Sequence, residues 1–295
     1  MKKNVFKTLG LSFLITSSLF TTTVFAAEKK SEPEKIEVTR FAYIDTADYS
    51  YLTTNKGIVV DMNVIGEDDF TLNKGRVEQD GHYNTDILYG IERIIGSNYA
   101  DQIIGDADDN IGNIFEGKAG DDTLSGGSGN DSLFGGSEND TLAGGSGDDS
   151  LSGEAGDDIF KASSYDDGSD VIDGEKDGAT TDSGVDTVDY SVITDSAYHL
   201  EVNLTDGNAV IKNSSAVTQQ TDTIKNIENV IGTSGADTFV GDAENNSFNG
   251  RSGNDTISYQ NITGSTAITI DLKNDVATGD GTDTLTSIEN AIGGA

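Results

Sequence analysis

The chain has 295 residues, with 52 acidic and 18 basic side chains, a formal net charge of −34 and 36 glycines. This surplus of negative charge excludes nucleic acid and anionic membrane faces as electrostatic partners, and it favours cations. The chain contains no cysteine, so disulfide bonds are excluded as a source of stability.

Residues 1–26 have the features of a secretory signal peptide. Three lysines precede an apolar run over residues 9–25, and small residues around Ala26 suit a cleavage site. The apolar run is short for a membrane span and contains several Ser and Thr residues, so we expect cleavage after Ala26 or Ala27 rather than anchoring. Residues 27–40 follow as a charged tether that contains the only proline. We therefore expect a secreted protein in which bound metal replaces disulfides.

Three related units, here called coil units, cover residues 41–95, 190–231 and 259–295. Each is marked by a tyrosine motif (TADYS, TVDYS or TISYQ), an alternating segment (IVVDM, LEVNL or ITIDL) and an Ile–Glu stretch (GIERIIG, NIENVIG or SIENAIG). Alternation with a period of two predicts a strand with one buried face. The third unit stops where nonapeptide rows follow in the other two, so we expect a fragment or a C-terminal edge that pairs with another copy.

Rows of nine residues recur over residues 96–189. Five rows follow one another: GKAGDDTLS from Gly117 (row 1), GGSGNDSLF from Gly126 (row 2), GGSENDTLA from Gly135 (row 3), GGSGDDSLS from Gly144 (row 4) and GEAGDDIFK from Gly153 (row 5). Position six is always aspartate: Asp122, Asp131, Asp140, Asp149 and Asp158. Position eight is always apolar: Leu124, Leu133, Leu142, Leu151 and Phe160. A fixed period of this kind predicts a stack of short identical elements.

Each position in a row has a physical reason. Glycines at positions one and four allow positive φ and tight turns. The last three positions suit a three-residue strand with one buried side chain, and stacked copies bury a continuous column. Stacking also brings the aspartates into register, where two charges about 4.8 Å apart repel by roughly 3.5 kcal/mol at an effective dielectric of about 20. A cation is therefore needed. Carboxylate and carbonyl oxygens favour Ca²⁺ over Mg²⁺, and the near absence of histidine argues against Zn²⁺.

Shorter blocks repeat the same phase elsewhere in the chain. Residues 232–258 form three rows, with Asp237, Asn246 and Asp255 at position six. The middle row has the neutral Asn246, so we interpret it as structural. Upstream, GSNYADQII is in phase through Asp101. We therefore add Asp101, Asp237 and Asp255 to the candidate metal ligands.

The rows resemble the GGxGxDxUx nonapeptide of the RTX (repeats-in-toxin, hemolysin-type calcium-binding) family. The resemblance implies an all-β, right-handed parallel β-roll or β-solenoid, with two rows per turn and several Ca²⁺ ions held in the turns between row n and row n+2. It implies shared ions for three pairs: Asp122 with Asp140, Asp131 with Asp149, and Asp140 with Asp158. It also implies carbonyl ligands from turn residues such as Gly120, Gly129 and Gly147, and intervening units that continue the parallel stack. Glu138 replaces the usual glycine of row 3, so we expect a distorted turn there.

Catalytic motifs are not evident, and we do not expect an enzyme. No HExxH or GxSxG sequence occurs, and His82 and His199 are interpreted as solvated or packing residues. We expect a secreted calcium-binding protein of a Gram-negative bacterium, unfolded at low calcium and folded outside the cell. Without calcium the rows resemble a disordered acidic spacer.

Three biological roles fit the sequence. The first is a structural, adhesive or surface-associated module, with a cell surface as partner and with self-association through the C-terminal edge. The second is a polysaccharide-binding accessory module, because RTX rolls also accompany alginate-modifying enzymes. The third is the non-catalytic tail of a truncated RTX toxin or enzyme. The leader at residues 1–26 departs from the uncleaved C-terminal export signal that is common in RTX proteins, which leaves the export route open.

Overall fold

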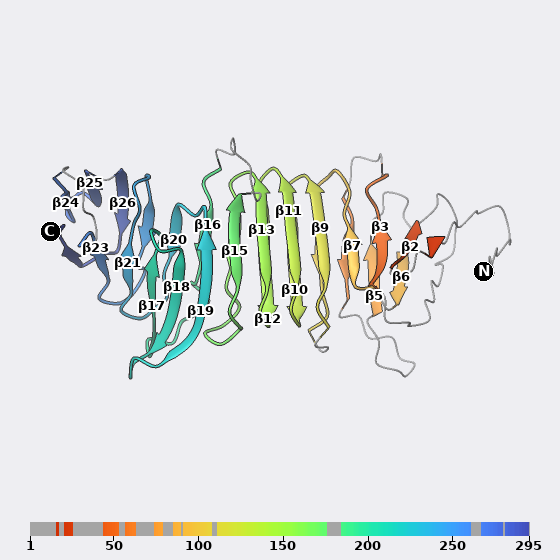
Figure 1. Cartoon of the computed structure of the whole chain (residues 1–295), viewed down its shortest axis with the longest axis horizontal. Helices are drawn as coiled ribbons and strands as arrows, with labels where there is room; N and C mark the ends of the chain where they lie inside the picture. Colours follow the sequence, from red (N-terminus) through yellow and green to blue (C-terminus); the bar gives the residue numbers. More distant parts are fainter. Residues whose placement is uncertain are drawn as a thin grey trace.

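The computed structural model is an elongated stack of β-strands, and the described residues contain no helix (Figure 1). The structure describes residues 16–17, 21–25, 44–52, 57–62, 74–78, 85–89, 91–107, 111–175, 184–260, 267–279 and 281–294. The predicted tether at 27–40 and most of the predicted leader lie outside these residues. A search of the described residues for a helix long and apolar enough to cross a membrane finds none.

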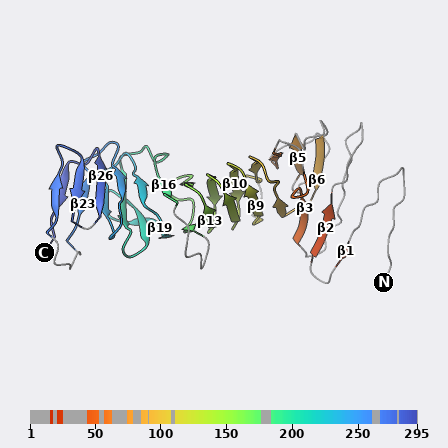
Figure 2. The same ribbon diagram turned by 90° about the horizontal axis from the view of Figure 1, so that it is seen from above.

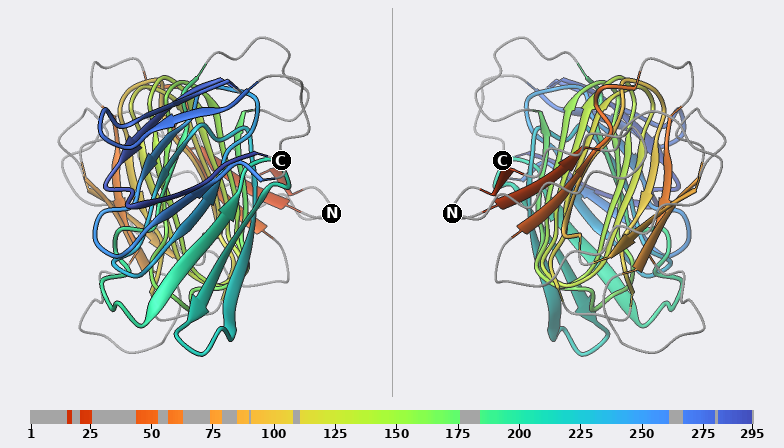
Figure 3. Two further views of the ribbon diagram at one scale, coloured as in Figure 1. Left: turned by 90° about the vertical axis from the view of Figure 1, so that its left-hand side faces the viewer. Right: turned by 90° about the vertical axis from the view of Figure 1, so that its right-hand side faces the viewer.

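The strands form two sheets that face each other across a narrow core, as the end-on views in Figure 3 show. In spatial order, sheet A contains β1 (Thr16–Ser17), β2 (Thr21–Phe25), β3 (Ile44–Asp48), β7 (Arg93–Ile95), β9 (Ile114–Ala119), β11 (Ser132–Ser137), β13 (Ser150–Ala155), β15 (Val171–Glu175), β19 (Thr218–Lys225), β18 (Asn208–Asn213), β17 (Tyr198–Asn203), β21 (Thr238–Val240), β23 (Thr256–Ser258) and β27 (Asn290–Ile292). Sheet B contains β24 (Thr269–Asp271), β25 (Val276–Thr278), β26 (Thr282–Thr286), β22 (Ser247–Asn249), β20 (Asn229–Ile231), β16 (Thr187–Asp189), β14 (Ile159–Lys161), β12 (Thr141–Ser146), β10 (Thr123–Ser128), β8 (Gln102–Ile104), β4 (Val59–Asp61), β5 (Lys74–Glu78) and β6 (Thr85–Tyr89).

Successive rows alternate between the two sheets. Strands β10 and β12 pair in parallel in sheet B, and β11 and β13 do so in sheet A. The pairing aligns Leu124 with Leu142 and Leu133 with Leu151, which are equivalent positions of rows n and n+2. This register confirms the all-β roll and the expected neighbourhood of alternate rows.

The strands of the rows are longer than expected. Each of β10 to β13 has six residues and includes the last three positions of one row and the first three of the next. Glycine pairs such as Gly127 with Gly145 join the ladder in register. The expected three-residue strand is therefore wrong for these rows, because the glycine-rich start of a row also pairs with its neighbour before the chain turns.

The core is the column of side chains at position eight. Leu124, Leu133, Leu142 and Phe160 are at most 1% exposed. The column continues along the stack, through rows and coil units, by way of Val188, Val230, Phe248 and Leu285 in sheet B, and Phe115, Ile172, Ile224, Phe239 and Ile257 in sheet A. Apolar side chains that face inward from both sheets therefore connect the rows and the coil units in one core.

The coil units are antiparallel meanders inside the parallel stack. In the second unit β17 pairs antiparallel with β18, and β18 with β19. The outer strands β19 and β17 pair in parallel with β15 and β21 respectively. The expectation of a continuous parallel stack is therefore correct at the borders of the unit and wrong within it, because two reversals return the chain to its original direction. Strands β24–β26 form a similar meander near the C-terminus (Figure 1), and β4–β6 form one near the N-terminus, where Figure 2 labels β5 and β6.

The Ile–Glu stretches form rungs of the stack. They contain β7, β20 and β27, and each of these strands pairs in parallel with a neighbour in its sheet. At the N-terminal end, β2 of the predicted leader pairs in parallel with β3.

Candidate metal centres

The aspartates at position six form a ladder along each side of the roll. In each case the Oδ1 atom accepts a hydrogen bond from the backbone N–H of position six in the neighbouring row of the same sheet. Asp122 N–H donates to Asp140 Oδ1 at 2.7 Å, Asp140 N–H to Asp158 Oδ1 at 2.7 Å, and Asp131 N–H to Asp149 Oδ1 at 2.8 Å. The three pairs implied by the RTX resemblance are therefore direct neighbours.

The second carboxylate oxygen of these residues is buried beside glycine. The Oδ2 atoms of Asp122, Asp140, Asp149 and Asp255 are buried and accept no hydrogen bond. A Cβ atom added to Gly117 would lie 2.1 Å from Asp122 Oδ2 and 2.5 Å from the carbonyl oxygen of Gly135. A carboxylate oxygen and a carbonyl oxygen thus both lie beside a residue with no side chain, and oxygen donors of these two kinds suit Ca²⁺.

Burial raises the pKa of these carboxyl groups. The pKa of Asp122 is raised to about 9, that of Asp140 to about 7 and that of Asp149 to about 6, in each case mainly by desolvation. Neighbouring carboxylates raise them further, and backbone N–H donors oppose the shift. A divalent cation beside Oδ2 would supply the positive charge that the protein itself does not place there.

The oxygen atoms of the backbone have to complete any such site. Within the part of the chain that the structure describes, no three acidic, histidine or cysteine side chains converge as a metal cluster. At Gly117 and Gly126, the glycine that borders the position-six carboxylate also borders a carbonyl oxygen from position one of the next row in the same sheet, which is that of Gly135 or Gly144 respectively. The predicted carbonyl ligands Gly120, Gly129 and Gly147 are at position four and stay a prediction.

The glycines differ in why they are needed. Positive φ occurs at position four, where Gly120, Gly129 and Gly147 have φ of 105°, 113° and 130°. Positive φ also occurs at position two, in Gly127 and Gly145. The prediction of positive φ at position one is wrong for rows 1–5. Position one is instead occupied by glycine because a side chain there would collide with the position-six carboxylate.

The turn of row 3 keeps its shape with glutamate in place of glycine. Glu138 has a φ of 74°, which is in the left-handed region. Its carboxylate accepts hydrogen bonds from the backbone N–H of Gly120 at 2.7 Å and from the hydroxyl of Ser137 at 3.0 Å. The expected distortion is replaced by local strain, which these two hydrogen bonds offset.

A second ladder, at position five, is not among the sequence predictions. Asn139 N–H donates to Asp121 Oδ1, Asp148 N–H to Asn130 Oδ1 and Asp157 N–H to Asn139 Oδ1, at 2.9–3.2 Å. The signal was present, because position five is Asp or Asn in all five rows. These exposed hydrogen bonds run in the opposite sense to those of the position-six ladder, and they tie each turn to its neighbour.

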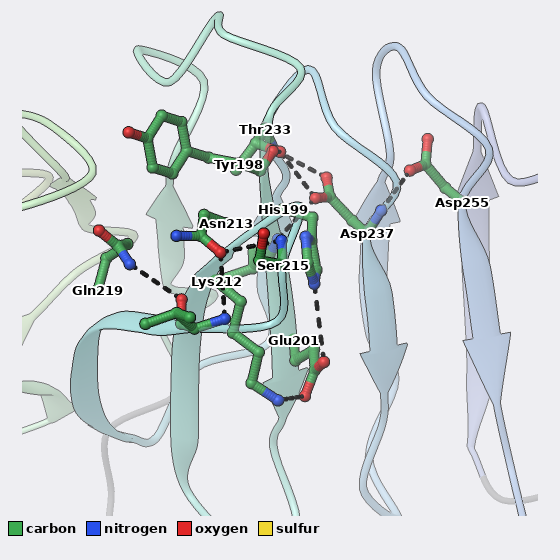
Figure 4. A network of polar contacts seen from close by, with 12 residues as sticks. Tyr198, His199, Glu201, Lys212, Asn213, Ser215, Gln219, Thr233, Asp237 and Asp255 are labelled. Carbon is green, nitrogen blue, oxygen red and sulfur yellow. Dashed lines mark hydrogen bonds and ion pairs between the residues drawn. The ribbon is translucent and has the colours of Figure 1, made fainter.

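In the first row of each block, a Ser or Thr residue donates hydrogen bonds to the position-six aspartate of the same row. Ser97 donates to Asp101 through its backbone N–H and its hydroxyl, and Thr233 does the same for Asp237 (Figure 4). Asp101 Oδ1 also accepts the N–H of Ile58 at 2.6 Å. The predicted ligands Asp101 and Asp237 therefore lie on the ladders, but their two oxygens already have donors from the protein, unlike the Oδ2 atom of Asp255.

The described histidine belongs to a surface ion-pair group. His199 Nε2 lies 3.8 Å from Glu201 Oε1, and Glu201 also binds Lys212 (Figure 4). These residues join β17 to β18 on the outside of the meander. His82 lies outside the described residues.

Comparison with known protein families agrees with this geometry. The model of the RTX calcium-binding nonapeptide repeat matches in four copies, over residues 86–111, 112–142, 134–164 and 229–259. The chain contains RTX calcium-binding nonapeptide repeats over residues 86–164 and 229–259. It is therefore a calcium-binding β-roll module, and the matched segments contain rows 1–5 and the second block of rows. No curated protein sequence matches the chain.

Proposed function

We propose that this RTX chain is a secreted structural or adhesive module that folds when calcium binds along its position-six ladders. The observation that carries the proposal is the set of buried Oδ2 atoms that accept no hydrogen bond at Asp122, Asp140, Asp149 and Asp255. Each buried charged oxygen without a hydrogen-bond donor costs several kcal/mol of folding free energy. The summed cost of several such oxygens is on the order of the stability of a whole domain. Bound calcium would remove that cost. Because the site exists only in the folded chain, the free energy of calcium binding adds to the free energy of folding.

The proposal places folding outside the cell. Extracellular calcium modules commonly bind at about 10⁻⁴ to 10⁻³ M, a range in which cytosolic calcium is too dilute to act. The leader sequence at residues 1–26 supports export, and the chain would then meet calcium only after crossing the membrane.

Calcium titration of the exported chain tests the proposal. We expect the circular dichroism signal of β-structure to rise from EGTA to millimolar Ca²⁺, with calorimetry giving the number of ions. Asp149→Asn removes one buried ligand charge and should weaken the apparent affinity by at least about tenfold or lose one ion. A full β signal in EGTA would contradict the coupling of folding to calcium.

A matched control is available at the adjacent residue. Asp148 is exposed at position five, where rows 2 and 3 already have asparagine at Asn130 and Asn139. Asp148→Asn therefore removes the same charge and keeps the acceptor of the position-five ladder. We expect its calcium affinity and stoichiometry to equal those of the parent chain. Equal losses in both variants would show that net charge, and not the ladder, determines binding.

Polysaccharide binding is a second candidate function, favoured by one surface feature. Tyr165 and Tyr198 stack with ring centroids 3.9 Å apart and an interplanar angle of 13°, and Tyr165 is 39% exposed. An exposed aromatic ring offers an apolar face to a sugar. A Tyr165→Ala variant that loses retention on an alginate column, with calcium binding unchanged, would support this role over a purely structural one.

We also propose that the chain has no catalytic role of its own. Its aspartates are used in the ladders, which supports a scaffold. The tail of an RTX toxin or enzyme remains the alternative, and a reading frame that continues the repeats would support it. Self-association through the C-terminal edge stays a prediction, and sedimentation of the calcium-bound chain would test it.

A further inference from the structure

The tyrosine of each coil unit is buried in the core of the stack. Tyr49, Tyr190 and Tyr259 are at most 2% exposed, and they are among the largest fully buried side chains of the described residues. Burying a phenol hydroxyl is unfavourable unless it forms a hydrogen bond. Two of these hydroxyls donate to carboxylates of the ladders.

Tyr190 binds the carboxylate that continues the ladder of sheet A into the second coil unit. Its hydroxyl donates to Asp222 Oδ2 at 2.7 Å. The Nε2 of Gln220 donates to the same oxygen at 3.1 Å, and Asp170 N–H donates to Asp222 Oδ1 at 3.1 Å. Asp222 stands two residues before the buried Ile224, which is the spacing between positions six and eight of a row. Asp222 is therefore the position-six aspartate of its rung, with donors on both oxygens.

Tyr259 has the same relation to the third coil unit. Its hydroxyl donates to Asp283 Oδ2 at 2.5 Å, and Asn246 N–H donates to Asp283 Oδ1 at 3.1 Å. Asp283 again stands two residues before a buried apolar side chain, Leu285. Two units separated along the chain thus repeat one arrangement, in which a tyrosine hydroxyl occupies the side of the carboxylate that in rows 1, 3 and 4 accepts no hydrogen bond.

We propose that the Tyr190 and Tyr259 hydroxyls replace calcium at their rungs. These two coil units then fold without metal, and the calcium-dependent rows assemble on the folded units. This inference rests on the proposed function, because it divides the ladder carboxylates into those that use calcium and those that use a protein donor. Burial raises the pKa of Tyr190 well above its usual value, so its hydroxyl stays protonated and able to donate.

Neighbouring residues extend the metal-independent segment. Glu228 Oε2 accepts the N–H of Asp186 at 2.7 Å, so the Ile–Glu stretch contributes a longer carboxylate to the ladder. Thr233 then binds both oxygens of Asp237 at the start of the second block. From β16 to β21 the carboxylates of Asp222, Glu228 and Asp237 thus have protein donors, whereas Asp122, Asp140 and Asp149 each keep one buried oxygen without a donor.

Hydrogen–deuterium exchange of the whole chain, in EGTA and in millimolar calcium, tests the inference. In EGTA we expect amides of residues 198–231 to keep their protection and amides of residues 114–161 to lose it. Calcium should then protect the second set. Tyr190→Phe removes only the hydroxyl, and in EGTA it should lower the protection of residues 198–231 by roughly 10- to 100-fold. Tyr99→Phe removes a phenol hydroxyl from a rung outside that segment and should leave that protection unchanged.

The outcomes separate this inference from the proposed function. Loss of protection over both segments in EGTA, with recovery of both in calcium, would overturn the inference and leave calcium-coupled folding intact. Equal protection of both segments with and without calcium would contradict the proposed function itself. A Tyr190→Phe chain that exchanges like the parent in EGTA would show that the hydroxyl does not replace a metal ion, even if the wild-type coil unit is protected.

Discussion

The glycine at position one is specified by what lies beside its Cα. At Gly126 an added Cβ atom would lie 2.1 Å from Asp131 Oδ2 and 2.5 Å from the carbonyl oxygen of Gly144. Neither neighbour can move freely, because one belongs to a buried carboxylate and the other to the paired backbone. The repeat pattern predicts glycine at this position, but the reason for it lies in a contact between two rows.

Gly126→Ala should therefore be strongly destabilising. We expect a loss of about 2–4 kcal/mol in unfolding free energy at saturating calcium, because the clash displaces the carboxylate and the strand together. Thermal unfolding followed by circular dichroism measures it. Gly293→Ala is the control, since an added Cβ meets nothing within 4 Å there. Equal melting temperatures for both variants would mean that this glycine is not under steric constraint.

The raised pKa values of the ladder carboxyls predict a dependence on pH in the absence of calcium. The pKa of Asp122 rises from 3.8 to about 9 and that of Asp140 to about 7 in the folded state. A carboxyl group whose pKa is higher when folded binds more protons when folded, so its contribution is complete below about pH 4 and is lost as pH rises through 7 to 9. In EGTA the β signal should therefore be larger at about pH 5.5 than at about pH 8.

Calcium should reverse this dependence. Binding requires ionised carboxylates, so the calcium affinity falls as the pH is lowered. Asp122→Asn removes a carboxyl group whose pKa burial raises to about 9, and it should flatten the profile in EGTA. A flat profile in the parent chain would mean that the ladder carboxylates are hydrated when calcium is absent.

The strand in a row is an element that the sequence predicts in kind but not in length. Period nine and the apolar residue at position eight predict a buried column, and Leu133 lies in that column between Phe115 and Leu151. The first three positions of a row contain mostly Gly and Ser, which have low strand propensity. They pair because the neighbouring row of the same sheet presents an equivalent backbone in register. This contact between rows cannot be predicted from the sequence of a single row.

Leu133→Ala should destabilise the roll by about 3–4 kcal/mol, because it leaves a cavity in a column with no alternative packing. The next residue, Phe134, is 36% exposed on the outer face of the same strand and serves as control. Phe134→Ala should change the unfolding free energy by less than about 1 kcal/mol. Chemical denaturation at fixed calcium measures both. Equal effects would contradict the assignment of inward and outward faces.

The meanders were harder to predict than the rows. The alternating segment LEVNL predicts β17 correctly. Strand β19 is polar at every position except Ile224, and its Gln220 and Asp222 are buried. Polar residues inside a strand weaken the hydrophobic period on which a sequence-based prediction depends. The burial of Asp222 is compensated by donors that the local sequence does not reveal, among them the Tyr190 hydroxyl 32 residues away along the chain.

Across the whole molecule, each rung contacts only its neighbours in the stack. The sequence predicts which aspartate belongs to each candidate site, because position six is aspartate in all of rows 1–5. Its two oxygens are not equivalent, however, because the partner of each depends on the rung beside it. Stability in such a solenoid is a sum of rung and interface terms. Loss of calcium therefore acts on many interfaces at once.

Small-angle scattering should report this global change. Without the predicted leader, the twelve strands of sheet A from β3 to β27, at a spacing of about 4.8 Å, predict a stack about 50 Å long in calcium. A compact stack of this length has a radius of gyration well below the roughly 60 Å of a fully unfolded chain. In EGTA we expect the radius of gyration to increase towards the unfolded value, because calcium no longer offsets the repulsion between the ladder carboxylates. Magnesium at the same concentration should not restore the compact form, since it keeps its waters and fits a carbonyl-rich site poorly. Identical profiles in EGTA and calcium would refute a calcium-dependent solenoid.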